Sequence, residues 1–199
     1  MTPTKKLEAT AYHEAGHAVA AFFLRRGFTR VSIIPGEDFL GQLVTTPPPR
    51  SLHPDCETDA RTELWLRREI TIFLAGPVAE KIHTGRGNWK IEGSSDVHNA
   101  VGLASYIIGD DEIGAYIHWL TLHTTNLLNH PHRWPIVQAL AAELLESRVI
   151  GARRARALMR EAWRKAAEAW RDAAIAARDK EEAAKGAYSK GGSPSGVAG

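Results

Sequence analysis

Apolar residues recur at helical spacing along most of this chain. In the first such stretch, apolar side chains three and four residues apart predict a helix over residues 4–26, which Gly27 ends. The same spacing predicts further helices over residues 58–81, 94–108, 112–128, 135–147 and 152–185. The pair Gly76-Pro77 lies inside the second of these helices, where we expect it to kink or split the helix.

Two short runs rich in β-branched and apolar residues follow the first predicted helix. They cover residues 30–35 and 39–46, and the turn-forming Pro35-Gly36-Glu37-Asp38 connects them, which predicts a hairpin. Three consecutive prolines at positions 47–49 end the second strand. The whole pattern therefore predicts a mainly α-helical protein with one small β-sheet, an α+β fold.

The composition agrees with a folded domain plus an appendage. The chain has 199 residues, of which 44% are hydrophobic and 24% charged, and these values exclude disordered, collagen-like and disulfide-scaffold proteins. The longest uncharged apolar run, residues 15–24, is about half the length of a membrane span. We therefore expect neither a transmembrane segment nor a secretory leader. The single Cys56 cannot form an internal disulfide, which favours a reducing compartment, and we expect the cytoplasm.

Charge is distributed unevenly along the chain. Residues 148–190 hold twelve Lys/Arg and six Asp/Glu, whereas the rest of the chain is mildly acidic. We therefore divide the chain into a folded domain at residues 1–150, a basic amphipathic helix at 151–185 and a disordered Gly/Ser-rich tail at 186–199. The apolar face of the basic helix predicts docking on its own or a neighbouring subunit. Because acidic residues are interspersed among the basic ones, no nucleic-acid partner is expected.

The strongest chemical signal is the sequence His13-Glu14-Ala15-Gly16-His17 within the first predicted helix. Residues four apart share a helix face, so both imidazoles can reach one metal ion. Glu14 lies beside them and can act as general base on a metal-bound water, the arrangement of zinc hydrolases. The alternative is a helix with two unrelated histidines. Gly16 argues against it, because a glycine within a helix costs about 1 kcal/mol relative to alanine.

Catalytic zinc usually takes a third protein ligand, and the chain offers several candidates. Asp96 ranks first, because the first turn of a predicted helix favours an ionised carboxylate. Glu80 ranks second and His83 third, whereas His98 faces another direction from Asp96. Since Asp is also common in first helical turns for structural reasons, these residues alone leave the choice open.

A further group of histidines lies among tryptophans between residues 118 and 134. Their spacing matches no ordinary set of metal ligands, and we interpret them as core and surface side chains. The group consists of His118, His123, His130 and His132.

Four blocks of the chain resemble the FtsH-type zinc metallopeptidase domain, the proteolytic half of membrane-anchored AAA proteases. The first is Thr-Ala-Tyr-His-Glu-Ala-Gly-His-Ala at residues 10–18, and the second is Ile-Ile-Pro at 33–35 followed by Gly41. The third is Leu-Ala-Gly-Pro-Val-Ala-Glu at residues 74–80, and the fourth is Gly-Ser-Ser-Asp at 93–96. With weaker similarity further on, the likeness spans about residues 6–162. Two positions depart from the family pattern: Pro77 replaces an Arg, and Ser95 replaces an Asn.

The resemblance implies one Zn²⁺ per chain, held by His13, His17 and Asp96, with Glu14 as the general base. Glu80 is kept from the family pattern and is a candidate hydrogen-bond partner of a ligand histidine. An extended peptide substrate could pair with the predicted second strand. The strand residues concerned are Gly41, Gln42, Leu43 and Val44.

We accordingly interpret residues 1–150 as a stand-alone zinc endopeptidase domain that cleaves unfolded or extended polypeptides. With no room for an ATPase module beside it, the hydrolysis itself is expected to be independent of ATP. The family assembles as a hexameric ring, which implies a homo-oligomer, up to a hexamer, and a separate partner for substrate delivery. Two alternatives stay open: a catalytically silent interaction protein with this fold, and a zinc hydrolase or regulator of another class.

Overall fold

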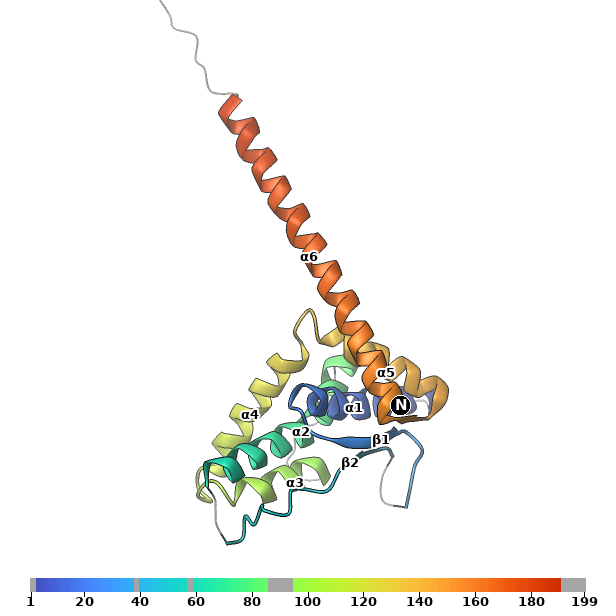
Figure 1. The fold of residues 1–199 in the computed structure, drawn as a ribbon, viewed down its shortest axis with the longest axis vertical. Helices are drawn as coiled ribbons and strands as arrows, with labels where there is room; N and C mark the ends of the chain where they lie inside the picture. Colours follow the sequence, from blue (N-terminus) through green and yellow to red (C-terminus); the bar gives the residue numbers. More distant parts are fainter. Residues whose placement is uncertain (1–2, 38–39, 57–58, 86–94, 191–199) are drawn as a thin grey trace, which may run out of the picture.

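The computed structural model describes residues 3–37, 40–56, 59–85 and 95–190 (Figure 1). Helices make up most of these residues and surround one small sheet, which confirms the predicted mainly α-helical fold. In chain order the elements are α1 (Pro3–Phe23), β1 (Phe28–Ser32), β2 (Gln42–Thr45), α2 (Ala60–Thr84), α3 (Ser95–Ala104), α4 (Ile113–Leu128), α5 (Trp134–Ser147), β3 (Val149–Gly151) and α6 (Ala152–Lys190).

The sheet has the strand order β2-β1-β3, with both pairings antiparallel. Strands β1 and β2 form the predicted hairpin, in which Val31 lies opposite Leu43. Strand β3 was not predicted, because three residues are too few to show a period-two pattern; its Ile150 also pairs with Val31. Among the described strands, β2 therefore lies at an edge of the sheet and has one side without a strand partner.

Helix α2 is continuous, with Pro77 inside it, so the expected split at Gly76-Pro77 is wrong. The helix begins after Asp59, whose side chain accepts a hydrogen bond from the Thr62 amide, and ends at Gly85 in a left-handed conformation. Residues on several sides of its middle are buried, from Ile70 to Ala79. Packing on these sides holds the helix together through a proline that would end an exposed helix.

Helix α1 is the central element of the core. Its alanines at positions 11, 15 and 18 are fully buried, and it packs against both α2 and α5 (Figure 1). Gly16 faces α2 so closely that a Cβ atom there would lie 2.5 Å from the Ala79 side chain. A glycine is therefore required at this position for steric reasons, and the close packing places the His13–His17 motif directly against α2.

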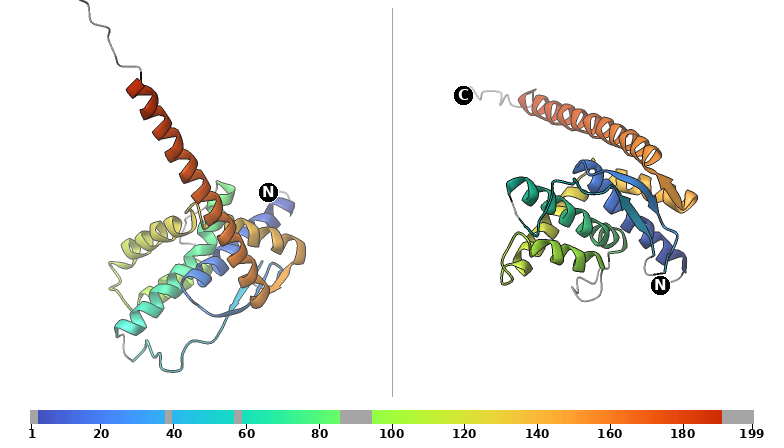
Figure 2. Two further views of the ribbon diagram at one scale, coloured as in Figure 1. Left: turned by 45° about the horizontal axis from the view of Figure 1, so that its top comes forward. Right: turned by 60° about the horizontal axis from the view of Figure 1, so that its bottom comes forward.

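Helix α6 starts on the body and then leaves it (Figure 2). Near its start, Ala155 and Met159 are fully buried against the core, whereas Trp163 and nearly all described side chains beyond Ala167 are exposed. The helix continues to Lys190, so residues 186–190 are helical where a disordered tail was expected; residues 191–199 lie outside the described part of the chain. No helix within the described residues combines the length and the apolar character that a membrane crossing requires.

Candidate zinc and catalytic site

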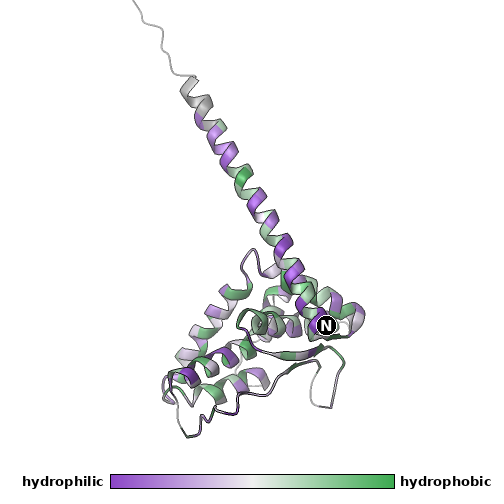
Figure 3. Cartoon of the chain, in the orientation of Figure 1, coloured by the Kyte–Doolittle hydropathy of each residue, from purple (hydrophilic) through white to green (hydrophobic). Residues whose placement is uncertain are grey.

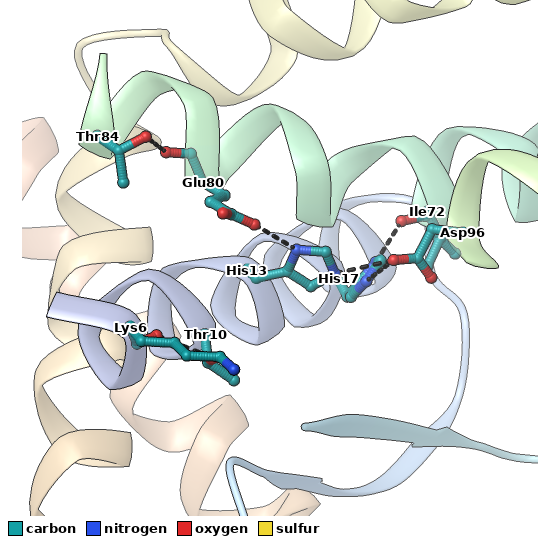
Figure 4. Close-up of polar contacts among 8 residues, drawn as sticks. All are labelled: Lys6, Thr10, His13, His17, Ile72, Glu80, Thr84 and Asp96. Atoms are coloured by element: carbon teal, nitrogen blue, oxygen red, sulfur yellow. Dashed lines mark hydrogen bonds and ion pairs between the residues drawn. The ribbon is translucent and has the colours of Figure 1, made fainter. Parts of the chain in front are cut away.

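Three potential metal ligands converge where α1, α2 and α3 meet (Figure 4). His13 and His17 come from successive turns of α1, and Asp96 comes from the first turn of α3. The Asp96 Oδ2 atom lies 2.8 Å from His13 Nε2 and 3.5 Å from His17 Nε2. One ligand atom from each of the three lies within 4.8 Å of the other two, a spacing that one metal ion can bridge.

Each histidine is oriented through its second ring nitrogen. His13 Nδ1 lies 3.1 Å from Glu80 Oε2, and His17 Nδ1 lies 2.7 Å from the backbone carbonyl oxygen of Ile72 (Figure 4). Because both partners only accept hydrogen bonds, each Nδ1 carries a proton and donates it. Each Nε2 is therefore turned toward Asp96, as metal-bound histidines usually are when an outer acceptor holds the other nitrogen.

Space for an ion is kept open by a glycine of α2. A Cβ atom at Gly76 would lie 2.6 Å from His13 Nε2 and 2.5 Å from His17 Cε1. Any larger residue would therefore occupy the side from which these nitrogens are approached. Two imidazoles and one carboxylate, each held on a helix, fit a catalytic zinc site with three protein ligands.

The carboxylates of Asp96 and Glu80 determine the protonation of His13. Burial alone would lower the pKa of His13, but the bonds to Asp96 and Glu80 outweigh it and raise that pKa to about 10. For Asp96, burial is outweighed by bonds to His13 and His17, and its pKa falls below the usual range. In the absence of metal, a proton shared between these groups takes the place of the cation.

Glu14 lies beside the ligands and is almost fully buried, with 4% of its surface exposed. Its Oε2 atom has no hydrogen-bond partner among the described residues, and burial raises the pKa of the carboxyl. Gly41, just before β2, packs on this side chain, and a Cβ atom there would lie 2.7 Å from Glu14 Oε1. Glu14 is thus a basic group in a dry environment, next to the ligand cluster and next to the edge strand.

The other sequence candidates lie elsewhere or play other parts. His83 stacks on Tyr12 at 3.5 Å between ring centroids and pairs with Glu8, away from the three-ligand cluster. His130 and His132 stack on each other, and His132 contacts Trp170, which agrees with their interpretation as packing and surface residues. Of the segment Gly93-Ser94-Ser95-Asp96, residues 93 and 94 lie outside the described residues.

Sequence reasoning missed two contributors to the site. The Ile72 carbonyl that orients His17 belongs to the backbone, so no side-chain pattern could reveal it. Gly76 belongs to a helix-breaking pair and to the family-like block at residues 74–80, and neither pattern indicates how closely it approaches the two histidines, although a glycine before Pro77 within an apolar helical stretch could have suggested it.

A family model supports the same interpretation of the fold. Residues 1–110 match the model of peptidase family M41, a range that includes α1 and the ligand candidates His13, His17 and Asp96. The chain belongs to peptidase family M41. The M41 match covers α1, the β1–β2 hairpin, α2 and α3.

Curated zinc metalloproteases are similar to this chain at low identity. The mouse ATP-dependent zinc metalloprotease YME1L1 is 26% identical over 145 residues, which cover 72% of this chain and 19% of the relative. The ATP-dependent zinc metalloprotease FtsH of Rickettsia felis is 30% identical over 122 residues, covering 57% of this chain and 18% of the relative. The FtsH of Marinobacter nauticus is 31% identical over 111 residues, covering 55% and 16%. The chain thus spans less than a fifth of the length of these relatives.

Proposed function

We propose that this chain is a zinc-dependent endopeptidase that hydrolyses peptide bonds of unfolded or extended polypeptides. The observation that carries the proposal is the environment of Glu14. Its carboxylate is buried and lacks a partner at Oε2, and it is adjacent in α1 to a ligand histidine. A structural glutamate would be paired or exposed, whereas a base that acts on a bound water needs a free oxygen facing the reaction site.

His13, His17 and Asp96 are the residues that would hold the ion. Zinc bound to them would keep one position for water, lower the pKa of that water to about 7 and polarise the peptide carbonyl. Glu14 would accept the proton of the attacking water at its carboxylate and later give that proton to the leaving amine. Its raised pKa helps the first transfer, because a carboxylate with a higher pKa is a stronger base toward the water. Glu80 would hold His13 in place through the Nδ1 contact.

The free side of β2 supports a substrate position next to Glu14. The Thr46 amide donates to the Gly27 carbonyl, toward β1. Because amide directions alternate along a strand, the amides of Leu43 and Thr45 point away from β1, toward the free edge. An extended peptide that pairs with residues Gly41–Val44 would pass the carboxylate that Gly41 contacts.

The decisive experiment compares wild type with Glu14→Gln. Bound zinc is measured by elemental analysis, and cleavage of a chemically unfolded reporter protein is measured without ATP. We expect about one zinc per chain in both proteins, and cleavage only in the wild type. Zinc without Glu14-dependent cleavage would favour a hydrolase or regulator of another class, and absence of zinc would favour an interaction protein.

Substrate pairing is tested at Leu43. Leu43→Pro removes the outward amide without removing a β1 hydrogen bond, so it should raise KM for peptides while zinc content stays unchanged. Leu43→Ala is the matched control, since it shortens the side chain and keeps the amide. If both variants raise KM equally, the side chain rather than the strand edge binds the substrate.

Three features of the setting stay proposals, and the family resemblance supports only the assembly among them. They are hydrolysis without ATP, assembly with further copies up to a hexamer, and a separate partner that delivers substrates. A cytoplasmic, reducing location is also proposed, and the exposed free thiol of Cys56 is consistent with it.

A further inference from the structure

A groove lies at the foot of α6, where this helix leaves the body. It encloses a cavity of about 370 Å³ between α6, the end of α1 and the α4–α5 connection. The rings of Phe23, Trp163 and Trp170 line it, and 46% of Trp163 and 56% of Trp170 is exposed. Tryptophans on a concave surface with this exposure are frequent anchors of protein interfaces.

The charged side chains of the groove are all basic. Arg133 and Arg171 line it together with two histidines, and none of the lining residues is acidic. Arg133 lies over the Phe23 ring at 4.9 Å, which fixes its guanidinium in the groove. Arg171 has no ion-pair partner among the described residues, although Arg164, Lys165, Arg178 and Lys185 on the same helix each have one. The groove therefore suits an acidic segment that also offers an apolar side chain.

Such a segment is present at the opposite end of α4. The connection between α3 and α4 presents Asp110, Asp111 and Glu112, all exposed and without an ion-pair partner among the described residues. Trp119 and Leu122, exposed by 50% and 51%, follow on α4. Since α4 has sixteen residues, the acidic connection and the groove are about 24 Å apart along this helix (Figure 1).

We propose that the groove at the foot of α6 receives the acidic 110–112 connection of a second copy of this chain. Each copy then contributes a basic, tryptophan-lined groove at one end of α4 and an acidic connection at the other, so the contact is head-to-tail. Figure 3 shows hydrophilic and apolar residues interleaved along α6, the helix that forms one wall of the groove. The proposal does not depend on catalysis, and it goes beyond assembly in general by naming both surfaces.

Sedimentation velocity of the full chain at 1–100 μM tests the contact, with Arg171→Glu and Asp111→Lys as the two reversed charges. Each variant alone places like charges opposite one another and should raise the dissociation constant at least about tenfold. In an equimolar mixture, the groove of the Arg171→Glu variant can receive the connection of the Asp111→Lys variant, which restores opposite charges. The other contact between the two variants joins an unchanged groove to an unchanged connection. The mixture should therefore associate with a dissociation constant close to that of the wild type.

Matched controls separate this contact from a general effect of charge. Lys180→Glu changes an exposed residue farther along α6, and Glu37→Lys changes an exposed acid near the hairpin; both should associate like the wild type. Glu14→Gln should also associate normally, whatever its activity. A wild type that stays monomeric at 100 μM overturns the proposal. So does a mixture that fails to recover association, and so do controls that weaken it as much as the two test variants.

Discussion

Replacing Gly76 by alanine should abolish most zinc binding while the fold survives. The new Cβ would lie 2.6 Å from His13 Nε2 and 2.5 Å from His17 Cε1. To restore ordinary contact at about 3.5 Å, the rings must move by roughly 1 Å. Ligand positions at a metal tolerate only about 0.2 Å, so two of the three protein ligands would be misplaced at once.

The expected loss of zinc affinity can be judged from smaller changes at metal sites. Loss of one outer partner of a ligand usually lowers metal affinity by about 10–100-fold, and displacement of two ligands should exceed that range. We therefore expect zinc affinity to fall at least about 100-fold, which corresponds to about 2.7 kcal/mol. Unfolding is affected less, because alanine gains about 1 kcal/mol in helix propensity. The steric clash, together with the restriction that Pro77 imposes on the preceding residue, should lower the free energy of unfolding by about 1–3 kcal/mol.

Competition with a chromophoric chelator measures zinc affinity, and urea unfolding in the presence of a chelator measures stability without the metal. Gly102→Ala is the matched control, because Gly102 also lies within a helix and a Cβ there would meet nothing within 4 Å. This variant should bind zinc normally and gain about 0.5–1 kcal/mol. If Gly76→Ala binds zinc within threefold of the wild type, the space that Gly76 leaves is not the space the ion needs.

Three further outcomes are expected. Glu80→Ala removes the partner of His13 Nδ1 and should lower zinc affinity about 10–100-fold without unfolding the protein; an unchanged chelator titration would contradict this. In a chelator, the ion pair of His13 and Asp96 stabilises the fold fully only between about pH 4 and 6.5. Tm should fall as pH rises from 6.5 toward 10, the pKa of His13, and again below about pH 4, where this aspartate takes up a proton in the unfolded chain but not yet in the folded protein. Saturating zinc, which replaces the proton, should remove the fall at high pH, and a flat Tm in chelator would refute the pairing. Glu69→Ala leaves Arg26 buried without its 2.5 Å partner and should cost about 3–5 kcal/mol in urea unfolding, and a loss below 1 kcal/mol would show that the pair is dispensable.

Features of the fold that depend on local periodicity could be predicted from sequence. The helices and the hairpin follow from short-range spacing and turn residues, and the structure has them within a few residues of the expected bounds. Two features depend on packing instead. Strand β3 forms because residues 149–151 meet β1, and α2 stays continuous through Pro77 because its middle is buried on several sides. The sequence around residues 149–151 does not show the contact with β1, and the sequence around Pro77 does not show which elements bury the middle of α2.

The candidate site shows the same division. The i, i+4 spacing places His13 and His17 on one helix face, but Asp96 is 83 positions from His13 and reaches it only through the tertiary fold. Asp96 and Glu80 were both third-ligand candidates on chemical grounds. The structure places them at different nitrogens of the same ring, Asp96 at Nε2 and Glu80 at Nδ1. Residue type cannot distinguish these two positions, because each suits a carboxylate.

The central position of α1 has a kinetic consequence for the metal. Two of the proposed ligands belong to the helix whose alanines form the middle of the core, so their backbone cannot open without global unfolding. Asp96 instead lies in the first turn of a ten-residue helix, and 18% of its side chain is exposed. The exchange of zinc with solution should therefore be governed by motion of the start of α3. Amide hydrogen exchange should be slowest around His13–His17 and fastest, among the three ligand positions, at Asp96.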